Sequence, residues 1–329
     1  MKKRIFLLWI MTFAIGFQSC QNTNKKSKPK GLQGNLIIFH AGSLSVPFRL
    51  IAKEFEKENP NVDVLLEAAG SVACARKITD LNKDCDIMAS ADYQVIDRFL
   101  IPNYAGWNIS FAANEMAIAF TDKSKSANEI TNKNWYEILA KPEVIYGRSD
   151  PNSDPCGYRS VMTTQLTALQ EGNPEILKIL DKDHNYIRPK EVDLLGLLEA
   201  NAIDYIFIYK SVATQHHLNY ITLNDSINLS NSDLSDWYTN AKVNIAGKKP
   251  RKYISLIGSP MVYSITQLKN APNAEAATAF LDFFFDTDKG MKIIEEQGQT
   301  SIIPAITSSY NQIPENFKKF ALDSNKNTE

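Results

Sequence analysis

The alternation of strand, loop and helix in the first third of the chain constrains its fold more than any other feature. Apolar segments lie at 35–39, 62–69 and 85–90, and each has the length of a buried strand. Helical apolar spacing follows the first two segments, at 46–58 and 72–82. This order predicts an α/β fold built on a parallel sheet with helices on both faces.

Small and polar residues stand at the carboxyl ends of these strands, as Gly42-Ser43, Gly70-Ser71 and Ala91-Asp92. Ligands of open α/β sheets bind at the carboxyl ends of the strands. The hydroxyls of Ser43 and Ser71, together with the N–H groups where the next helices begin, predict an anion site. The alternative is that each serine only caps the helix that follows it.

Two similar apolar strands, at 114–121 and 260–266, enclose a second α/β segment. If they pair and cross between two lobes, they form a hinge with a ligand cleft beside it. The alternative is two independent domains joined once. The predicted divisions are a signal peptide at 1–20, a tether at 21–34, a first lobe at 35–113 and 260–329, and a second lobe at 114–259.

The amino terminus has the features of an export signal. Met1-Lys2-Lys3-Arg4 is basic, and the apolar run from Ile5 to Phe17 is shorter than the roughly 20 residues that span a bilayer. Ser19-Cys20 resembles the end of a lipobox, in which the cysteine is lipidated; the alternative is a plain signal peptide. The polar segment after Cys20 has the composition of a flexible tether. We therefore expect an exported protein, anchored by lipid and facing the periplasm or cell exterior.

Charge and cysteine content exclude some classes of protein. The net charge is −1, and basic residues form no stripe interleaved with aromatics, which argues against nucleic-acid binding. Cys74 and Cys85 either pair in an oxidising compartment or stay free. Cys156 lies at a helix start, where thiol pKa values fall, so it is a candidate nucleophile, although no histidine lies in a partner motif.

The segment "DPCGYRS", residues 154–160, places a carboxylate in a turn that ordinarily favours an anion. Either Asp154 caps its own helix, or the ligand accepts a carboxylate. Glu191 precedes another helical pattern and either complements the helix dipole or joins the site. Tyr209 ends the apolar run "IDYIFIY", where its phenol either donates to a ligand or packs in the core.

Six segments carry a resemblance to a known family: "FHAGSL", "EAAGS", "ADY", "NWYEIL", "DPCGYRS" and "DYIFIYKSVA". In this order they resemble the tungstate/molybdate-binding proteins of ABC importers, and the archaeal-type tungstate-binding group in particular. The similarity extends from about Asn35 to beyond Pro304. It implies a type II periplasmic-binding-protein fold, with two lobes joined by two crossing strands and the ligand cleft between them.

The resemblance also implies a site and a role. Its oxyanion-binding residues, carried over by motif, are Gly42, Ser43, Ser71, Asp154, Pro155, Cys156, Glu191 and Tyr209. The segment 163–189 is shorter than in the family, so Asp193 is an alternative to Glu191. In the family the metal is six-coordinate, with four oxo groups and two carboxylates, here Asp154 and Glu191; hard metal centres favour such oxygen ligands.

The resemblance thus implies a monomeric, non-enzymatic receptor without a cofactor. It would deliver tungstate or molybdate to a permease and its ATPase. The alternatives are a receptor for sulfate or phosphate, an exported hydrolase that uses Cys156 or the carboxylates, and a scavenger of metal cations.

Overall fold

The computed structural model describes residues 31–247 and 251–324. The predicted signal peptide, the lipobox cysteine Cys20 and most of the predicted tether lie outside these ranges. Within them, no helix combines the length and the apolar character needed to cross a bilayer.

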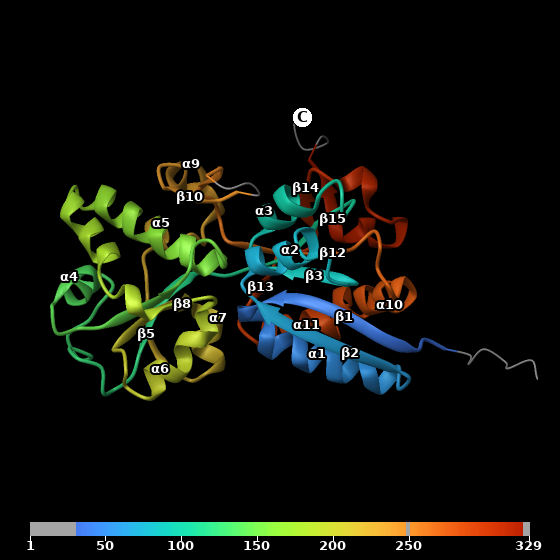
Figure 1. Cartoon of the computed structure of the whole chain (residues 1–329), viewed down its shortest axis with the longest axis horizontal. Coiled ribbons are helices and arrows are strands. Elements are labelled where there is room, and N and C mark those ends of the chain that lie inside the picture. Colours follow the sequence, from blue (N-terminus) through green and yellow to red (C-terminus); the bar gives the residue numbers. More distant parts are fainter. Residues whose placement is uncertain (1–30, 248–250, 325–329) are drawn as a thin grey trace, which may run out of the picture. The chain divides into compact units, whose positions relative to one another are not determined.

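The first sheet has six strands in the order β13-β4-β12-β3-β1-β2 (Figure 1). They are β1 (Gly34–Ala41), β2 (Val62–Ala69), β3 (Ile87–Ser90), β4 (Ile109–Ala113), β12 (Val262–Gln267) and β13 (Thr300–Ser301). Strand β1 pairs in parallel with β2 and β3, as the alternating pattern predicts, whereas β12 runs antiparallel to β3 and β4. We call this sheet and its helices the first lobe.

Aromatic packing holds the helices of the first lobe against its sheet. These are α1 (Ser45–Glu58), α2 (Ser71–Thr79), α3 (Tyr93–Val95) with the π-helical turn η2 (Ile96–Leu100), α10 (Ala274–Phe285) and α11 (Gly290–Glu296). Phe48 and Phe55 of α1 are buried, and their rings lie 5.6 Å from Phe284 and 5.2 Å from Phe280 of α10. The helical spacing of apolar residues in α1 therefore serves to bury one face.

The second sheet has five strands in the order β7-β6-β8-β5-β9. They are β5 (Met116–Phe120), β6 (Tyr146–Ser149), β7 (Ile187–Arg188), β8 (Tyr205–Tyr209) and β9 (Asn219–Thr222). Its α-helices are α4 (Trp135–Ala140), α5 (Pro155–Gln170), α6 (Leu195–Glu199), α7 (Lys210–Gln215), α8 (Asp225–Asn228) and α9 (Ser235–Tyr238). Trp135 of α4 is buried with its ring 5.6 Å from Phe207 of β8. We call this sheet and its helices the second lobe.

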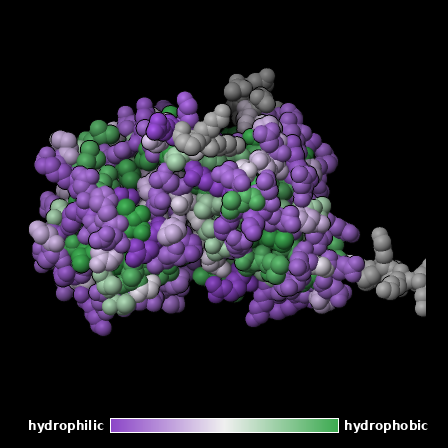
Figure 2. All heavy atoms as spheres, viewed as in Figure 1, coloured by the Kyte–Doolittle hydropathy of each residue, from purple (hydrophilic) through white to green (hydrophobic). Residues whose placement is uncertain are grey.

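Short elements complete the described chain. Two small sheets pair β10 (Lys242–Ala246) with β11 (Tyr253–Ile257) and β14 (Ala305–Thr307) with β15 (Ala321–Asp323). The 3-10 helices are η1 (Gly42–Leu44), η3 (Pro174–Asp181), η4 (His184–Tyr186), η5 (Glu191–Leu194), η6 (Ser232–Leu234), η7 (Tyr310–Gln312) and η8 (Glu315–Phe320). On the face shown in Figure 2, hydrophobic residues form separate patches among hydrophilic ones.

The chain crosses between the sheets twice. It leaves β4 and enters β5 through Asn114 and Glu115, and it returns from β11 to β12 through residues 258–261. The predicted pairing of segment 114–121 with segment 260–266 is wrong, because β5 belongs to the second sheet and β12 to the first. Strand β12 instead pairs with β4, with Tyr263 opposite Ala112.

Candidate functional site

Loops of the two lobes meet at the carboxyl ends of β1 and β2. A Cβ atom at Gly70 would lie 2.2 Å from the carbonyl oxygen of Ser153, and one at Gly42 would lie 3.1 Å from Oε2 of Glu191. The backbone N–H of Ala73 donates to the carbonyl of Ser153 at 3.1 Å. Glycine at Gly42 and Gly70 therefore permits an approach that a side chain would obstruct.

Two buried carboxyl groups from the second lobe lie at this contact. Asp154 is 1% exposed and Glu191 is 0% exposed. Oδ2 of Asp154 accepts a hydrogen bond from the backbone N–H of Glu191 at 3.2 Å. Oδ1 of Asp154 and both carboxylate oxygens of Glu191 have no hydrogen-bond partner among the residues that the structure describes. Burial of a hydrogen-bond acceptor without a partner costs free energy. These oxygens therefore favour a ligand with an electropositive centre that they can coordinate.

Helix capping does not account for Asp154. It occupies the N-cap position of α5, yet its side chain makes no capping hydrogen bond. Its carboxylate faces Glu191 instead. Of the two roles that the sequence left open for Asp154, the geometry therefore favours the ligand site.

Burial raises the pKa of Asp154. It raises the pKa of Glu191 well above the ordinary value of 4.5, and the nearby charge of Asp154 adds to that shift. Because the folded-state pKa values of both groups lie above their unfolded-state values, protonation of this pair stabilises the folded protein. That stabilisation is fully present below the ordinary carboxyl pKa and is lost as the pH rises through the raised values. At neutral pH an electron-poor ligand centre would offset the cost of the two charges.

Three buried hydroxyl groups around the carboxylates each retain a free proton. Oγ of Ser43 accepts from the phenol of Tyr263 at 3.0 Å, and Oγ of Ser71 accepts from the N–H of Ala91 at 3.0 Å. The phenol oxygen of Tyr209 accepts from Nη1 of Arg159 at 3.0 Å. In the described part of the chain, the hydroxyls of Ser43, Ser71 and Tyr209 accept these hydrogen bonds and donate none. All three are thus free to donate to an anion.

Backbone donors supplement the hydroxyls. Ser71 is the first residue of α2, and Cys156 is the second residue of α5. The first N–H groups of a helix have no acceptor within that helix. Pro155 lacks an N–H and occupies the first helical position, where its fixed φ suits the turn.

Cys156 is placed poorly for nucleophilic chemistry. Its thiol is buried and donates toward the carbonyl of Phe207 at 3.7 Å. Burial raises its pKa well above the usual thiol value. A buried thiol of this kind is unreactive, so Cys156 is available to a ligand only through its backbone.

The structure separates the two candidates for the second carboxylate. Glu191 lies in η5 with its oxygens directed at Gly42. The side chain of Asp193 is 31% exposed and forms an ion pair with Lys190. Glu191 is therefore beside Asp154, whereas Asp193 has its own partner.

Sequence reasoning assigned no role to Tyr263, Asn114 or Arg159. Tyr263 of β12 positions Ser43, and Nδ2 of Asn114 donates to the phenol of Tyr263 at 3.0 Å. Arg159 lies in the "DPCGYRS" segment and is 2% exposed. The signal in the sequence is that Arg159 is the one charged residue of the segment 155–170.

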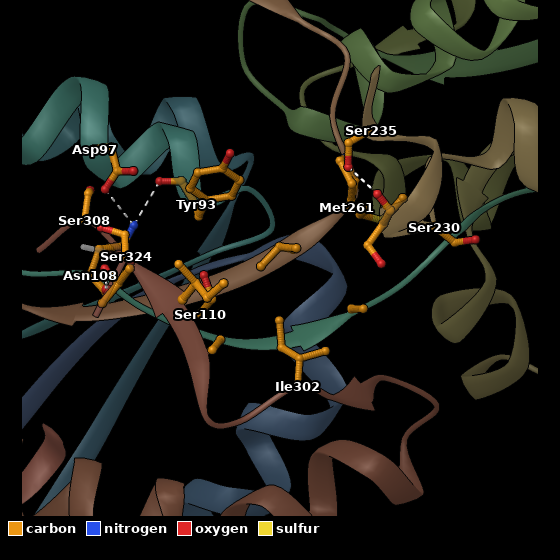
Figure 3. Close-up of a pocket in the computed structure, with 17 residues that line it drawn as sticks. Tyr93, Asp97, Asn108, Ser110, Ser230, Ser235, Met261, Ile302, Ser308 and Ser324 are labelled. Atoms are coloured by element: carbon orange, nitrogen blue, oxygen red, sulfur yellow. Dashed lines mark hydrogen bonds between the residues drawn. The ribbon is translucent and has the colours of Figure 1, made fainter. Parts of the chain in front are cut away.

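A second feature is a cavity of about 750 Å³ beside the crossings (Figure 3). Val262 lines it, whereas the neighbouring Tyr263 reaches Ser43, so β12 separates the cavity from the carboxylates. The lining includes Asp97, whose pKa is raised by burial, and the described residues that line it include no lysine, arginine or histidine. This electrostatic setting does not favour a dianion.

The cysteines and acidic groups do not form a cation site. Among the described residues, no group of three or more histidine, cysteine, aspartate or glutamate side chains is arranged to hold a metal ion. Cys74 and Cys85 are free, buried thiols.

Two sheet-centred lobes, two crossings and a buried polar site where their loops meet define a solute-binding protein. The chain belongs to the bacterial extracellular solute-binding protein family, whose model matches residues 36–300. This is a non-enzymatic family of transport proteins, which confirms the prediction that the chain is not an enzyme.

Relatives of known sequence cover most of the chain. It is 40% identical to the molybdate/tungstate-binding protein WtpA of Thermococcus kodakarensis, over 95% of this chain and 94% of the relative. It is 44% identical to the protein of that name from Pyrococcus abyssi, over 86% and 88% of the two chains. An uncharacterized solute-binding protein of Petrotoga mobilis is 46% identical over 88% and 90%. The predicted family resemblance is confirmed.

Solved structures share the fold. The periplasmic molybdate-binding protein of Azotobacter vinelandii matches with a TM-score of 0.58 at 13% identity, over 82% of this chain and 99% of that one. The sulfate-binding protein SubI of Mycobacterium tuberculosis matches with a TM-score of 0.59 at 12% identity, over 89% and 93%. The predicted two-lobed α/β fold of the type II class is confirmed.

Proposed function

We propose that this protein binds tungstate or molybdate in the site formed by Asp154, Glu191 and the surrounding hydroxyls, as the receptor of an ABC importer. The observation that carries the proposal is the pair of buried carboxyl groups, three of whose oxygens have no hydrogen-bond partner among the described residues, beside three hydroxyls that donate no hydrogen bond there. The names of the archaeal relatives support it.

The two sets of groups suit the two parts of such an anion. Ser43, Ser71 and Tyr209, with the N–H of Cys156, donate to the oxo groups. Asp154 and Glu191 ligate the hexavalent metal, a hard centre that accepts further oxygen ligands. Gly42 and Pro155 shape the loops around these donors. The anion is the cargo of the protein and not its cofactor.

The proposal includes lobe boundaries and an anchor. We assign 35–113 with 260–329 to one lobe and 114–259 to the other, and we infer that ligand binding favours closure between them. We also infer that Cys20 is lipidated and tethers a monomeric receptor outside the cytoplasm, where it delivers its ligand to the permease and ATPase.

Lipidation at Cys20 has a direct consequence for membrane association. The variant Cys20→Ser should move from the membrane pellet to the soluble fraction, because acyl chains supply most of the membrane affinity of such proteins. Cell fractionation before and after a salt wash measures this. A variant that stays in the washed pellet would contradict the anchor while leaving the binding proposal intact.

Titration calorimetry of the purified protein tests the proposed ligand. Tungstate and molybdate should each bind with one-to-one stoichiometry and raise the melting temperature, since a ligand of the native state stabilises it by mass action. Sulfate and phosphate at the same concentrations should do neither. Absence of heat and of stabilisation with both tungstate and molybdate would refute the proposal.

A further inference from the structure

A buried polar cluster joins the two lobes beside the candidate site. Asp92 follows β3 of the first lobe, and Tyr158 and Arg159 belong to α5 of the second. The phenol of Tyr158 donates to Oδ2 of Asp92 at 2.5 Å, and Nη2 of Arg159 lies 3.4 Å from the same oxygen. The side chains of Arg159 and Asp92 are only 2% and 6% exposed, so this ion pair lies almost entirely out of water.

The guanidinium of Arg159 also connects the first lobe with the candidate ligand site. Nη1 donates to the carbonyl of Ala91 at 2.7 Å and to the phenol oxygen of Tyr209 at 3.0 Å. The bond to Tyr209 occupies a lone pair of that phenol and leaves its proton directed elsewhere. Arg159 therefore holds the orientation of Tyr209, and the first lobe holds Arg159.

A contact within the first lobe orients Asp92 independently of the second lobe. Its Oδ1 accepts the N–H of Gln94 at 2.9 Å as the N-cap of α3. Only Oδ2 is used by Tyr158 and Arg159. Separation of the lobes would therefore leave Asp92 in place and expose its partners on α5 to water.

We propose that Asp92, Tyr158 and Arg159 form a latch that closes the lobes and, through Arg159, orients Tyr209 toward the bound oxyanion. This inference rests on the proposed function. Asp92 and Arg159 are positioning residues in this scheme, since they act through Tyr209 and through closure. Release of the ligand then requires that a desolvated ion pair and the Tyr158 hydrogen bond break together.

The latch predicts a change in dissociation rather than in association. Encounter takes place with the lobes apart, before the cluster forms, whereas loss of a partner from a buried charged pair acts on the dissociation rate. In Asp92→Asn the amide oxygen still caps α3. The amide nitrogen then replaces Oδ2, so the variant loses both the charge that pairs with Arg159 and the acceptor of the Tyr158 hydrogen bond. Tyr158→Phe removes one hydroxyl and leaves the ion pair.

Stopped-flow kinetics with tungstate tests the latch in the full chain. Asp92→Asn should raise the dissociation rate by at least about tenfold and change the association rate by less than about twofold. Tyr158→Phe should raise the dissociation rate less. Glu67→Gln is the matched control, because it breaks the Lys77–Glu67 ion pair within the first lobe, where the atoms are 2.5 Å apart and the Glu67 side chain is 49% exposed. Its rates should equal those of the wild type.

A double-mutant cycle tests the route through Tyr209. If Asp92 acts on Tyr209 through Arg159, the effects of Asp92→Asn and Tyr209→Phe on dissociation should be less than additive. Full additivity would overturn the orienting role, and dissociation rates equal to those of Glu67→Gln would overturn the latch altogether. Failure of the wild type to bind tungstate would instead refute the proposed function.

Discussion

Replacement of Glu191 by glutamine is expected to weaken tungstate binding by at least about 100-fold, because loss of a group that only supports a metal ligand already costs about 10- to 100-fold. Glutamine keeps the shape of the side chain and removes its charge. Asp154→Asn should have an effect of the same order. Titration calorimetry against tungstate gives both affinities.

The sign of this effect separates two accounts of the carboxylates. If they ligate the metal, both variants bind tungstate more weakly. If they are bystanders, removal of a negative charge near a dianion strengthens binding. Asp193→Asn is the matched control, since Asp193 is two residues from Glu191 and is paired with Lys190. It should bind as the wild type does.

In the absence of ligand, replacement of Glu191 should not lower the stability of the protein at neutral pH. Burial raises the pKa of Glu191, so the wild type loses stability as the pH rises above the ordinary carboxyl value of 4.5. Glu191→Gln removes that titration. Thermal unfolding of the ligand-free variant should therefore depend less on pH, with a melting temperature at neutral pH no lower than that of the wild type.

The double variant Asp154→Asn/Glu191→Gln is expected to bind sulfate, which we expect the wild type to reject. Sulfur in sulfate takes no further oxygen ligands, so the two carboxylates only repel it. Two unit charges about 4 Å apart repel by about 4 kcal/mol at an effective dielectric of about 20, which is roughly a 10³-fold change in affinity. The ratio of tungstate to sulfate affinity should fall by at least that factor.

A third substitution shows whether the gained sulfate lies in the same site. Adding Ser43→Ala to the double variant removes a donor whose proton is free in the structure. Sulfate affinity should then fall again. Thermal-shift titrations with sulfate, phosphate and tungstate measure all three proteins. A double variant that still rejects sulfate and still binds tungstate tightly would show that the carboxylates do not set selectivity.

Much of the fold was predictable because it is encoded by local patterns. The segments 35–39 and 62–69 and the helical spacing of 46–58 correspond to β1, β2 and α1. The partner of β12 was not predictable in this way, since both β4 and β5 are apolar strands of similar length beside the same crossing. Which of them pairs with β12 depends on the tertiary arrangement, and the pattern of hydrophobic residues does not record it.

The candidate site likewise has residues that local sequence patterns predict and residues that only the tertiary structure reveals. Ser43 and Ser71 were predictable because parallel strands bring their carboxyl ends to one edge of a sheet. Asp92 lies within the "ADY" segment, but its partner Arg159 is 67 residues away on the other lobe, and only the fold brings them together. Tyr263 is a further case, since a core tyrosine and one that positions Ser43 have the same local pattern.

The central claim is that the two carboxylates ligate the metal of the bound anion. X-ray absorption at the tungsten edge of the one-to-one complex tests it most directly. We expect four short tungsten–oxygen bonds from the oxo groups and two longer ones from Asp154 and Glu191, with one of the longer bonds missing in Glu191→Gln. A wild-type spectrum of four equivalent oxygen neighbours, unchanged in Glu191→Gln, would contradict the claim.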